Sequence, residues 1–503
     1  MPNFFLTTPL YYVNDKPHIG HAYTTILADV IARYHKVMNE DVFFLTGTDE
    51  HGQKVQEAAE KRKISPKTHV DEYVNEFLNM WEKLHIDYDN FIRTTEKRHT
   101  SKVKKVLKNL FDRGEIYKDK YEGLYSVSEE RFITSKEAEE GDFREVKKLV
   151  EENYFFKMSK YQNKLISHIK KNPDFIQPES RKNEVLGFLK QPLNDLCISR
   201  PKSRLQWGIE LPFDDKYVTY VWFDALLNYI TAIGWDENEE LFRKWWPANY
   251  HLIGKDILTT HSVYWPTMLM SIGIPLPKTI FAHGWWLSGE TKMSKSLGNV
   301  VNPLDIIDEY GVDPLRYFLM KEMVLGKDSI FTIDLFIERY NSDLANDYGN
   351  LVNRVTILIH KHFNSMIPKP GNFNEIDLEL IGIAKSIPQS VKNDIEELKI
   401  PDAIEKILTL MRKVNKYLEV KSPWKSIKID SSPESESATT MYISADLLRI
   451  CSQLLFPVMP DKTIQILKML GSDKILISDY STGLVKPGQL LGNGKSPFPR
   501  INI

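Results

Sequence analysis

Cysteine is nearly absent from this sequence, and neither sign of charge is in marked excess. Only Cys197 and Cys451 occur in 503 residues, which excludes a disulfide framework and a zinc site built on paired cysteines. The formal net charge of -2 provides no global attraction to nucleic acid, so such a partner would need local basic surfaces. No apolar run is long enough to cross a membrane, and "MPNFFLTTPLYY" lacks the features of a targeting peptide. We therefore expect a soluble cytoplasmic protein with no membrane partner.

The familiar phosphate-binding loops are missing as well. No G-x-G-x-x-G occurs, and "QLLGNGKS" near the end of the chain carries Gln489 where a P-loop requires its first glycine. If the chain binds a nucleotide, other residues must hold the phosphates.

The N-terminal part of the chain has the pattern of a β-α-β unit. "FFLTT" is typical of a buried strand, apolar residues then recur every three or four positions from Ile19 to Tyr34, and "DVFFLTG" is again strand-like. This pattern predicts an α/β fold with a parallel sheet, whose ligands bind outside the carboxyl ends of the strands.

Two segments are candidates for binding phosphate. In "NDKPHIGHAYTT", at the predicted helix start, unpaired N–H groups favour phosphate, His18 and His21 add donors, and Gly20 leaves room for a flat ring such as adenine. In the polar segment "GETKMSKSLGN", Lys292 and Lys295 could close over a polyphosphate. The alternatives are structural, because the histidines could cap or pack the helix start and the lysine segment could be a solvated surface loop.

Together the two segments resemble the class I aminoacyl-tRNA synthetases, whose "HIGH" and "KMSKS" motifs stand here letter for letter. The stretches "TTPLYYVNDKPHIGHAYTT", "FLTGTDEHGQKV", "YVWFDALLNYIT", "LIGKDILTTHSVYWP" and "HGWWLSGETKMSKSLGN" are similar to segments of methionyl-tRNA synthetases. The resemblance implies ATP-dependent ligation of L-methionine to tRNA(Met), in which methionyl-adenylate forms with release of pyrophosphate and the methionyl group then passes to the 3'-terminal adenosine. It also implies Mg²⁺ as the companion of ATP. The residues implied for catalysis and ATP binding are His18, His21, Lys292 and Lys295, with Gly20 added for ATP.

The same resemblance assigns a methionine site. Asp49, in the turn after the second strand, corresponds to the ligand of the amino group, with Pro9 and Leu10 contributing backbone contacts. The pocket for the thioether side chain is implied to consist of Tyr12, Trp222, Ala225, Leu226, Tyr229, Ile257 and His261. Without the resemblance, Asp49 could cap a helix and the aromatic residues could be plain core. A metal cluster of Asp49, Glu50 and His51 is disfavoured because adjacent side chains point in different directions.

We expect five segments along the chain. A Rossmann-like catalytic domain, interrupted by an inserted connective domain, precedes a region around the lysine motif and an all-α helical-bundle domain that binds the anticodon. The predicted bounds are 1–116, 117–217, 218–280, 281–333 and 334–503.

In the helical domain, a polar series recurs every four residues. Asn346, Asn350 and Arg354 should share one helix face, with Leu344, Tyr348, Leu351 and Val355 on the apolar side. By the resemblance, these three polar residues and Trp424 read the CAU anticodon. Without the resemblance, the polar series would be interpreted as an ordinary solvent-exposed helix face.

The sequence departs from the family in its inserted domain, where many relatives carry the cysteine pairs of a zinc knuckle. In "YSVSEERF", Ser126 and Glu129 take the place of one such pair, so no structural zinc is expected. The chain also ends without the module that dimerises some relatives, which predicts a monomer.

Rival functions fit the sequence less well. Leucine, isoleucine and valine synthetases insert a long editing domain, for which this chain has no room. A cysteine enzyme would be expected to use zinc. A non-catalytic tRNA-binding paralogue is disfavoured because the motif residues are all present.

Overall fold

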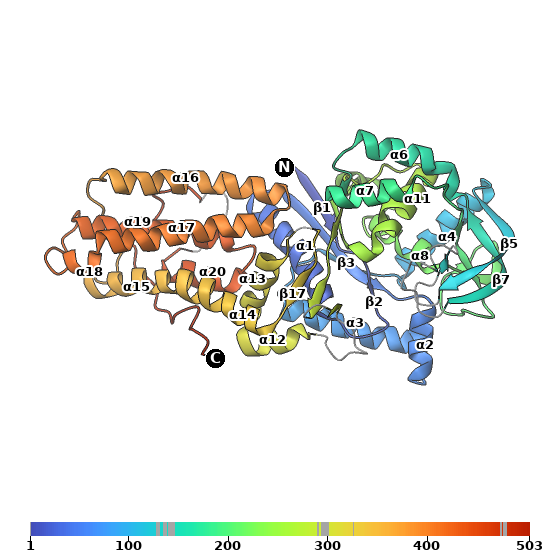
Figure 1. Cartoon of the computed structure of the whole chain (residues 1–503), viewed down its shortest axis with the longest axis horizontal. Helices are drawn as coiled ribbons and strands as arrows, with labels where there is room; N and C mark the ends of the chain where they lie inside the picture. Colours follow the sequence, from blue (N-terminus) through green and yellow to red (C-terminus); the bar gives the residue numbers. More distant parts are fainter. Residues whose placement is uncertain are drawn as a thin grey trace.

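The computed structural model describes residues 2–126, 131–133, 138, 146–288, 291–292, 301–324, 326–472, 475 and 480–502. The molecule is elongated, with a parallel sheet near its middle, an antiparallel β-rich lobe at one end and a bundle of helices at the other (Figure 1). The α/β class and the C-terminal helical part predicted from the sequence are confirmed.

In the described part of the chain, seven strands make up the central sheet, in the order β2-β3-β1-β13-β14-β8, with β4 also paired to β3. All of these pairs are parallel, and β1 lies between β3 and β13, as in a doubly wound fold. The strand β8 joins this sheet beside β14 although it comes from the range predicted for the inserted domain. The strands are β1 (Asn3–Thr7), β2 (Tyr11–Tyr12), β3 (Asp41–Asp49), β4 (Asn90–Arg93), β8 (Ile176–Gln177), β13 (Tyr250–Gly254) and β14 (Thr279–His283).

The sheet separates two hydrophobic cores, because successive side chains of a strand point to opposite faces. Phe4 and Leu6 of β1 belong to the core that contains α1 and α3, whereas Phe5 belongs to the core that contains α4 and α11. Helix α1 follows the predicted periodicity and is buried along most of its length. The helical segments of this region are α1 (Ile19–Val37), α2 (Gln53–Lys61), α3 (Pro66–Lys83), α4 (Lys97–Asp112), α8 (Val221–Ala225), α9 (Asn228–Thr231), α10 (Glu239–Trp245), η2 (Lys255–Ile257), η3 (Thr260–Tyr264) and α11 (Trp265–Ile272).

The β-rich lobe interrupts the central sheet between β4 and β13. Its long strands β5 and β7 pair antiparallel over eleven residues (Figure 1). A small antiparallel sheet packs against β7, whereas α6 contacts α11 and α7 contacts β8. The segments are β5 (Ile116–Ser126), β6 (Arg131–Ile133), β7 (Val146–Phe156), η1 (Met158–Tyr161), α6 (Gln162–Lys171), α7 (Glu179–Phe188), β9 (Leu196–Cys197), β10 (Ser199–Pro201), β11 (Glu210–Leu211) and β12 (Asp214–Thr219).

The helical bundle shares one continuous core with the α1 side of the sheet. Arg316, fully buried on α13, reaches Asp29 of α1 (Nη2 to Oδ2, 2.5 Å) and donates from Nε to the carbonyl oxygen of Val458 at 2.9 Å. This arginine therefore connects the first helix to the bundle. The segments are β15 (Trp286–Ser288), β16 (Thr291–Lys292), α12 (Pro303–Tyr310), α13 (Val312–Glu322), β17 (Ser329–Phe331), α14 (Ile333–Arg339), η5 (Tyr340–Gly349), α15 (Asn350–His362), α16 (Glu375–Glu396), α17 (Ile400–Lys421), α18 (Pro423–Ser426), α19 (Glu436–Leu455) and α20 (Pro460–Met469).

Candidate active site

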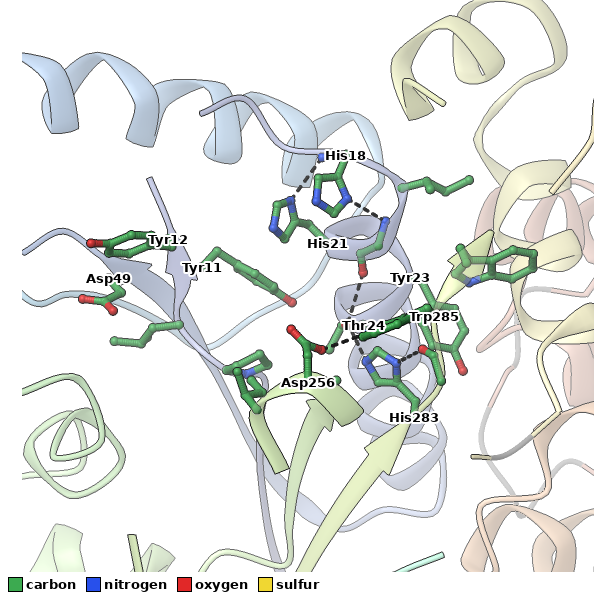
Figure 2. A pocket seen from close by; sticks show the side chains of 18 of the residues that line it. Tyr11, Tyr12, His18, His21, Tyr23, Thr24, Asp49, Asp256, His283 and Trp285 are labelled. Atoms are coloured by element: carbon green, nitrogen blue, oxygen red, sulfur yellow. Dashed lines mark hydrogen bonds between the residues drawn. The ribbon is translucent and has the colours of Figure 1, made fainter. Parts of the chain in front are cut away.

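A cavity of about 470 Å³ opens at the carboxyl ends of the central strands, where the β-α-β pattern predicted a ligand site. The start of α1 and the residues after β13 and β14 form one side, and β2 with the end of β3 forms the other (Figure 2). The predicted residues among its lining are Pro9, Leu10, Tyr12, His18, Gly20, His21, Asp49, Trp222 and Ile257.

His18 and His21 close the first turn of α1 as a reciprocal cap. The His18 ring accepts from the Gly20 N–H through Nδ1 at 3.1 Å, and the His21 ring accepts from the His18 N–H through Nδ1 at 3.1 Å (Figure 2). This is the geometry of a capping box, with histidines in place of the usual hydroxyl and carboxylate. The structural alternative is therefore correct, but it does not replace the functional one, because both rings also line the cavity.

The cap fixes the hydrogen positions on both rings. A nitrogen that accepts from a backbone N–H carries no hydrogen, so each ring is the neutral tautomer with its hydrogen on Nε2. The two rings are stacked, with centroids 3.9 Å apart, and both line the cavity.

The His18 ring leaves little room for a side chain at Gly20, which explains a glycine there without the predicted approach of adenine. A Cβ atom built on it would lie 3.0 Å from Cε1 and 3.1 Å from Nδ1 of His18, tighter than ordinary side-chain contacts. The His18 ring would have to shift by a few tenths of an ångström to admit a larger residue. The approach of adenine to this backbone stays a prediction.

Asp49 lies beside Tyr12 at the end of the sheet. Strand pairing sets Tyr12 directly opposite Asp49, and the Asp49 side chain is 5% exposed at the edge of the cavity (Figure 2). The alternative that Asp49 caps a helix is wrong, because Gly52 is the N-cap of α2.

The two residues after Asp49 have different partners. Glu50 is fully buried and accepts from Arg93 (Nε to Oε1, 2.6 Å), whereas His51 Nδ1 lies 2.6 Å from Oδ2 of Asp224. The three neighbouring side chains diverge as expected. Among the described residues, no group of three or more histidine, cysteine, aspartate or glutamate side chains could hold a metal ion.

A second, much smaller cavity of about 10 Å³ lies deeper, beyond Asp49. Tyr229 and His261 form its polar end: His261 Nδ1 donates to the carbonyl oxygen of Ile257 at 3.0 Å, so its Nε2 accepts from the Tyr229 hydroxyl at 2.8 Å. The lining contains Leu10, Asp49, Trp222, Ala225, Leu226, Asn228, Tyr229 and His261. The structure thus brings together most residues predicted for the thioether pocket. This small cavity adjoins the larger one, since Leu10, Asp49 and Trp222 line both.

Burial keeps His261 neutral, which predicts a pH-dependent stability. Burial lowers the pKa of His261 from 6.5 to about 4. Between those values an unfolded histidine binds a proton and the folded one does not, so the folded state loses stability as pH falls from about 6.5 toward 4. We expect His261 to cost about 2 kcal/mol of unfolding free energy at pH 5 relative to pH 7. Denaturant unfolding at both pH values should show a smaller loss in His261→Gln, and equal losses in the two proteins would contradict this.

Several residues that line the cavity were not predicted from the sequence patterns. Asp256 follows β13, and its Oδ1 accepts from the Trp285 indole N–H at 3.2 Å (Figure 2). Lys54 is on the first turn of α2, and its Nζ lies 5.8 Å from the centre of the Tyr12 ring. His283 ends β14, and its Nε2 lies 2.8 Å from the Thr24 hydroxyl of α1. The sequence could have indicated Asp256 and His283, because "GKD" and "HGWW" follow two strand-like runs. Parallel sheets bind their ligands at the carboxyl ends of such strands.

The lysine motif is described only at its start. Lys292 ends β16, whose backbone pairs with β15, the strand that follows the cavity residue Trp285. Lys295 lies outside the described residues, as does Glu129 of the inserted domain. Ser126 is buried at the end of β5. The expected absence of structural zinc stays a prediction.

The predicted anticodon residues lie on the bundle, but not on one α-helix. Residues Tyr340–Gly349 form a π-helix that continues into α15 at Asn350, so Asn346 and Asn350 lie on different helix types. That the three polar side chains share one face stays a prediction. Both asparagines are exposed, and Arg354 of α15 approaches Glu419 of α17 at 3.8 Å. Trp424, on α18, is half-buried. The apolar side was predicted correctly, with four residues buried: Leu344, Tyr348, Leu351 and Val355.

Comparison with known proteins agrees with this arrangement of sheet, cavity and bundle. The family model described as tRNA synthetases class I (M) matches residues 4–142 and 141–356, and the anticodon binding domain of methionyl tRNA ligase matches residues 367–491. The methionine–tRNA ligase of Caldanaerobacter subterraneus is 45% identical over 99% of this chain and 79% of its own length. That of Clostridium acetobutylicum is 46% identical over 99% of this chain and 78% of its own length. The chain belongs to the methionyl-tRNA synthetase family.

Solved structures of this family have the same fold. A Mycobacterium tuberculosis methionyl-tRNA synthetase in complex with methionyl-adenylate superposes with a TM-score of 0.95 and 39% identity, covering 99% of this chain and all of that one. The apo form of that enzyme gives a TM-score of 0.87 and 37% identity, covering 100% of this chain and 99% of that one. As a member of the family, the chain is a class I methionine–tRNA ligase, which uses ATP to activate methionine and charges tRNA with it. No described helix is long and apolar enough to cross a membrane.

Proposed function

We propose that ATP binds between the start of α1 and the ends of β13 and β14, with His18 and His21 donating from Nε2 to its phosphates. The observation that supports this is the reciprocal cap, which holds both rings at the cavity as neutral donors. Neutral donors placed at a helix N-terminus stabilise the negative charge that develops on pyrophosphate as it leaves. Lys292 and Lys295 supply further positive charge in this proposal. ATP enters as its Mg²⁺ complex, because the ion usually binds substrate phosphates with one or two carboxylates.

The methionine substrate occupies the opposite side of the cavity in this proposal. Its ammonium group binds the buried carboxylate of Asp49, beside the backbone of Pro9 and Leu10, and its side chain enters between Tyr12, Trp222 and Tyr229. Ala225, Leu226, Ile257 and His261 complete the pocket. Its carboxylate then faces the α-phosphate of ATP, and alignment of these two groups lets the adenylate form without a covalent enzyme intermediate.

ATP–pyrophosphate exchange with several amino acids tests this assignment of substrate. We expect methionine to support exchange at a rate at least about 100-fold above leucine, isoleucine and cysteine, because a pocket fitted to one thioether excludes branched side chains and gains less from shorter ones. Exchange that is equal with leucine or cysteine would contradict the proposed pocket.

We further propose that Asn346, Asn350, Arg354 and Trp424 contact the CAU anticodon. Exposed amides and a guanidinium can hydrogen-bond unstacked bases, and a half-exposed indole can stack on one. The five predicted segments and the monomeric state stay predictions.

Trp424→Ala should separate the two half-reactions. Loss of one stacked base contact costs about 1–3 kcal/mol, so kcat/KM for tRNA charging should fall about 5- to 150-fold. Methionine-dependent exchange, which needs no tRNA, should stay within about two-fold of wild type. An equal fall in both rates, with the melting temperature preserved, would contradict the placement of Trp424 at the anticodon.

A further inference from the structure

Behind the deep cavity, three buried titratable side chains form a hydrogen-bonded chain that the proposed reaction does not use. Asp224 of α8 accepts from His51 Nδ1 at its Oδ2 (2.6 Å) and from His99 Nε2 at its Oδ1 (2.7 Å). His99 Nδ1 lies 2.8 Å from the hydroxyl oxygen of Thr231 on α9. Asp224 is 1% exposed and His99 is 0% exposed, so neither side chain reaches solvent.

These three hydrogen-bonded side chains stabilise a charged carboxylate in the protein interior. Burial acts to raise the pKa of Asp224, but the charge and hydrogen bonds of His51 and His99 more than offset it, so that pKa lies below its ordinary value. A buried carboxylate with both oxygens hydrogen-bonded is stable, whereas removing one partner leaves a desolvated polar group that costs several kcal/mol. The three side chains are therefore a rigid unit.

This unit joins the two halves of the proposed methionine site. His51 follows Asp49 by two residues at the end of β3, and Asp224 lies on α8 two residues after Trp222. His51 and Asp224 are 173 residues apart in sequence, so their hydrogen bond is a direct link between the ammonium ligand and the wall of the side-chain pocket. Thr231 extends the link to α9, which carries Tyr229.

The short helices α8 and α9 depend on contacts with other elements for their position. Helix α8 has five residues and α9 has four, and neither has a side-chain cap. Helices this short are unstable by themselves in water, so their place depends on tertiary anchors. Asp224 is the anchor of α8 that contacts both the end of β3 and the long helix α4.

We propose that Asp224, held between His51 and His99, is a positioning residue for methionine: it fixes α8, and with it Trp222, relative to Asp49. The inference rests on the proposed methionine site and adds residues that touch neither substrate. Its effect should fall on methionine binding, because its hydrogen bonds among the described residues join the end of β3, α4, α8 and α9, whereas the start of α1 and the residues after β13 and β14 form the ATP side of the cavity.

Asp224→Asn tests the proposal, because the amide keeps the shape but faces one of the two histidine N–H groups with its own N–H. We expect the KM for methionine in pyrophosphate exchange to rise about 10-fold or more, with the KM for ATP within about two-fold of wild type. His99→Gln and Thr231→Val should give smaller changes of the same kind.

A matched control is Asp377→Asn in the bundle. Asp377 is also a buried carboxylate, accepting from the Tyr417 hydroxyl at 2.8 Å and paired with Lys421 at 3.1 Å, so its loss should lower the melting temperature without changing either KM. A folded Asp224→Asn enzyme whose methionine KM stays within two-fold of wild type would overturn the proposal. So would an equal rise in both KM values. If Asp224→Asn does not fold, His99→Gln decides by the same criteria.

Asp49→Asn distinguishes failure of this inference from failure of the site on which it rests. If Asp49→Asn leaves the methionine KM unchanged, the methionine site itself is misplaced and the positioning role falls with it. If Asp49→Asn raises the methionine KM and folded Asp224→Asn does not, only the positioning role is wrong.

Discussion

His18→Asn is expected to lower kcat for methionine-dependent pyrophosphate exchange about 100-fold and to leave the melting temperature within a few degrees of wild type. Asparagine is among the best N-cap residues, and its Oδ1 can accept from the Gly20 N–H as His18 Nδ1 does. It is too short to place a donor where His18 Nε2 lies. Removing one preorganised donor from developing negative charge typically costs 100- to 1000-fold in kcat. Exchange kinetics and a thermal melt on the same preparation measure both quantities.

His18→Ala is the matched control for the cap. It removes the donor and the cap together, so it should show the same fall in kcat with an added loss of about 1 kcal/mol in unfolding free energy. If His18→Asn retained near wild-type kcat, the ring would serve only to cap α1. The proposal that it binds phosphate would then be wrong.

Asp49→Asn should have the second large effect, a fall of about 30- to 5000-fold in kcat/KM for methionine. The carboxylate is 5% exposed, so an ammonium group bound there is shielded from water, and loss of a buried charged partner costs about 2–5 kcal/mol. The KM for ATP should change little, because Asp49 lies on the opposite side of the cavity from His18 and His283 (Figure 2). Initial rates of pyrophosphate exchange at varied methionine and ATP measure both.

A substrate analogue provides the control for Asp49. Replacing the ammonium group of methionine by a hydroxyl should weaken binding strongly in the wild-type enzyme and only slightly in Asp49→Asn, since the lost partner is then absent already. If both proteins discriminate equally between methionine and its hydroxy analogue, another residue binds the ammonium group.

The sequence was sufficient to predict those elements that follow from the residue pattern of a single segment. The β-α-β unit, the buried course of α1 and the apolar side of the bundle all follow from periodicity within one segment, and each is present. The position of the cavity followed from the same pattern, since a strand-to-helix junction at the carboxyl edge of a parallel sheet is a general binding site. The assignment of roles within it depended on the resemblance to a family.

Contacts between distant parts of the chain could not be predicted in this way. His51, Asp224 and His99 look unrelated in sequence, and only the packing of α4, α8 and the end of β3 brings them together. The π-helix at Tyr340–Gly349 is a second case, because its periodicity of polar residues resembles that of an α-helix. The joining of β8 to the central sheet is a third, since a two-residue strand carries almost no pattern.

A crystal structure of this chain with a non-hydrolysable methionyl-adenylate analogue tests the proposed site most directly. We expect the ammonium group within hydrogen-bond distance of the Asp49 carboxylate and the thioether among Trp222, Tyr229 and His261. The Nε2 atoms of His18 and His21 should be turned toward the phosphate side. An ammonium group bound away from Asp49, or phosphate oxygens with no contact to either histidine, would contradict it.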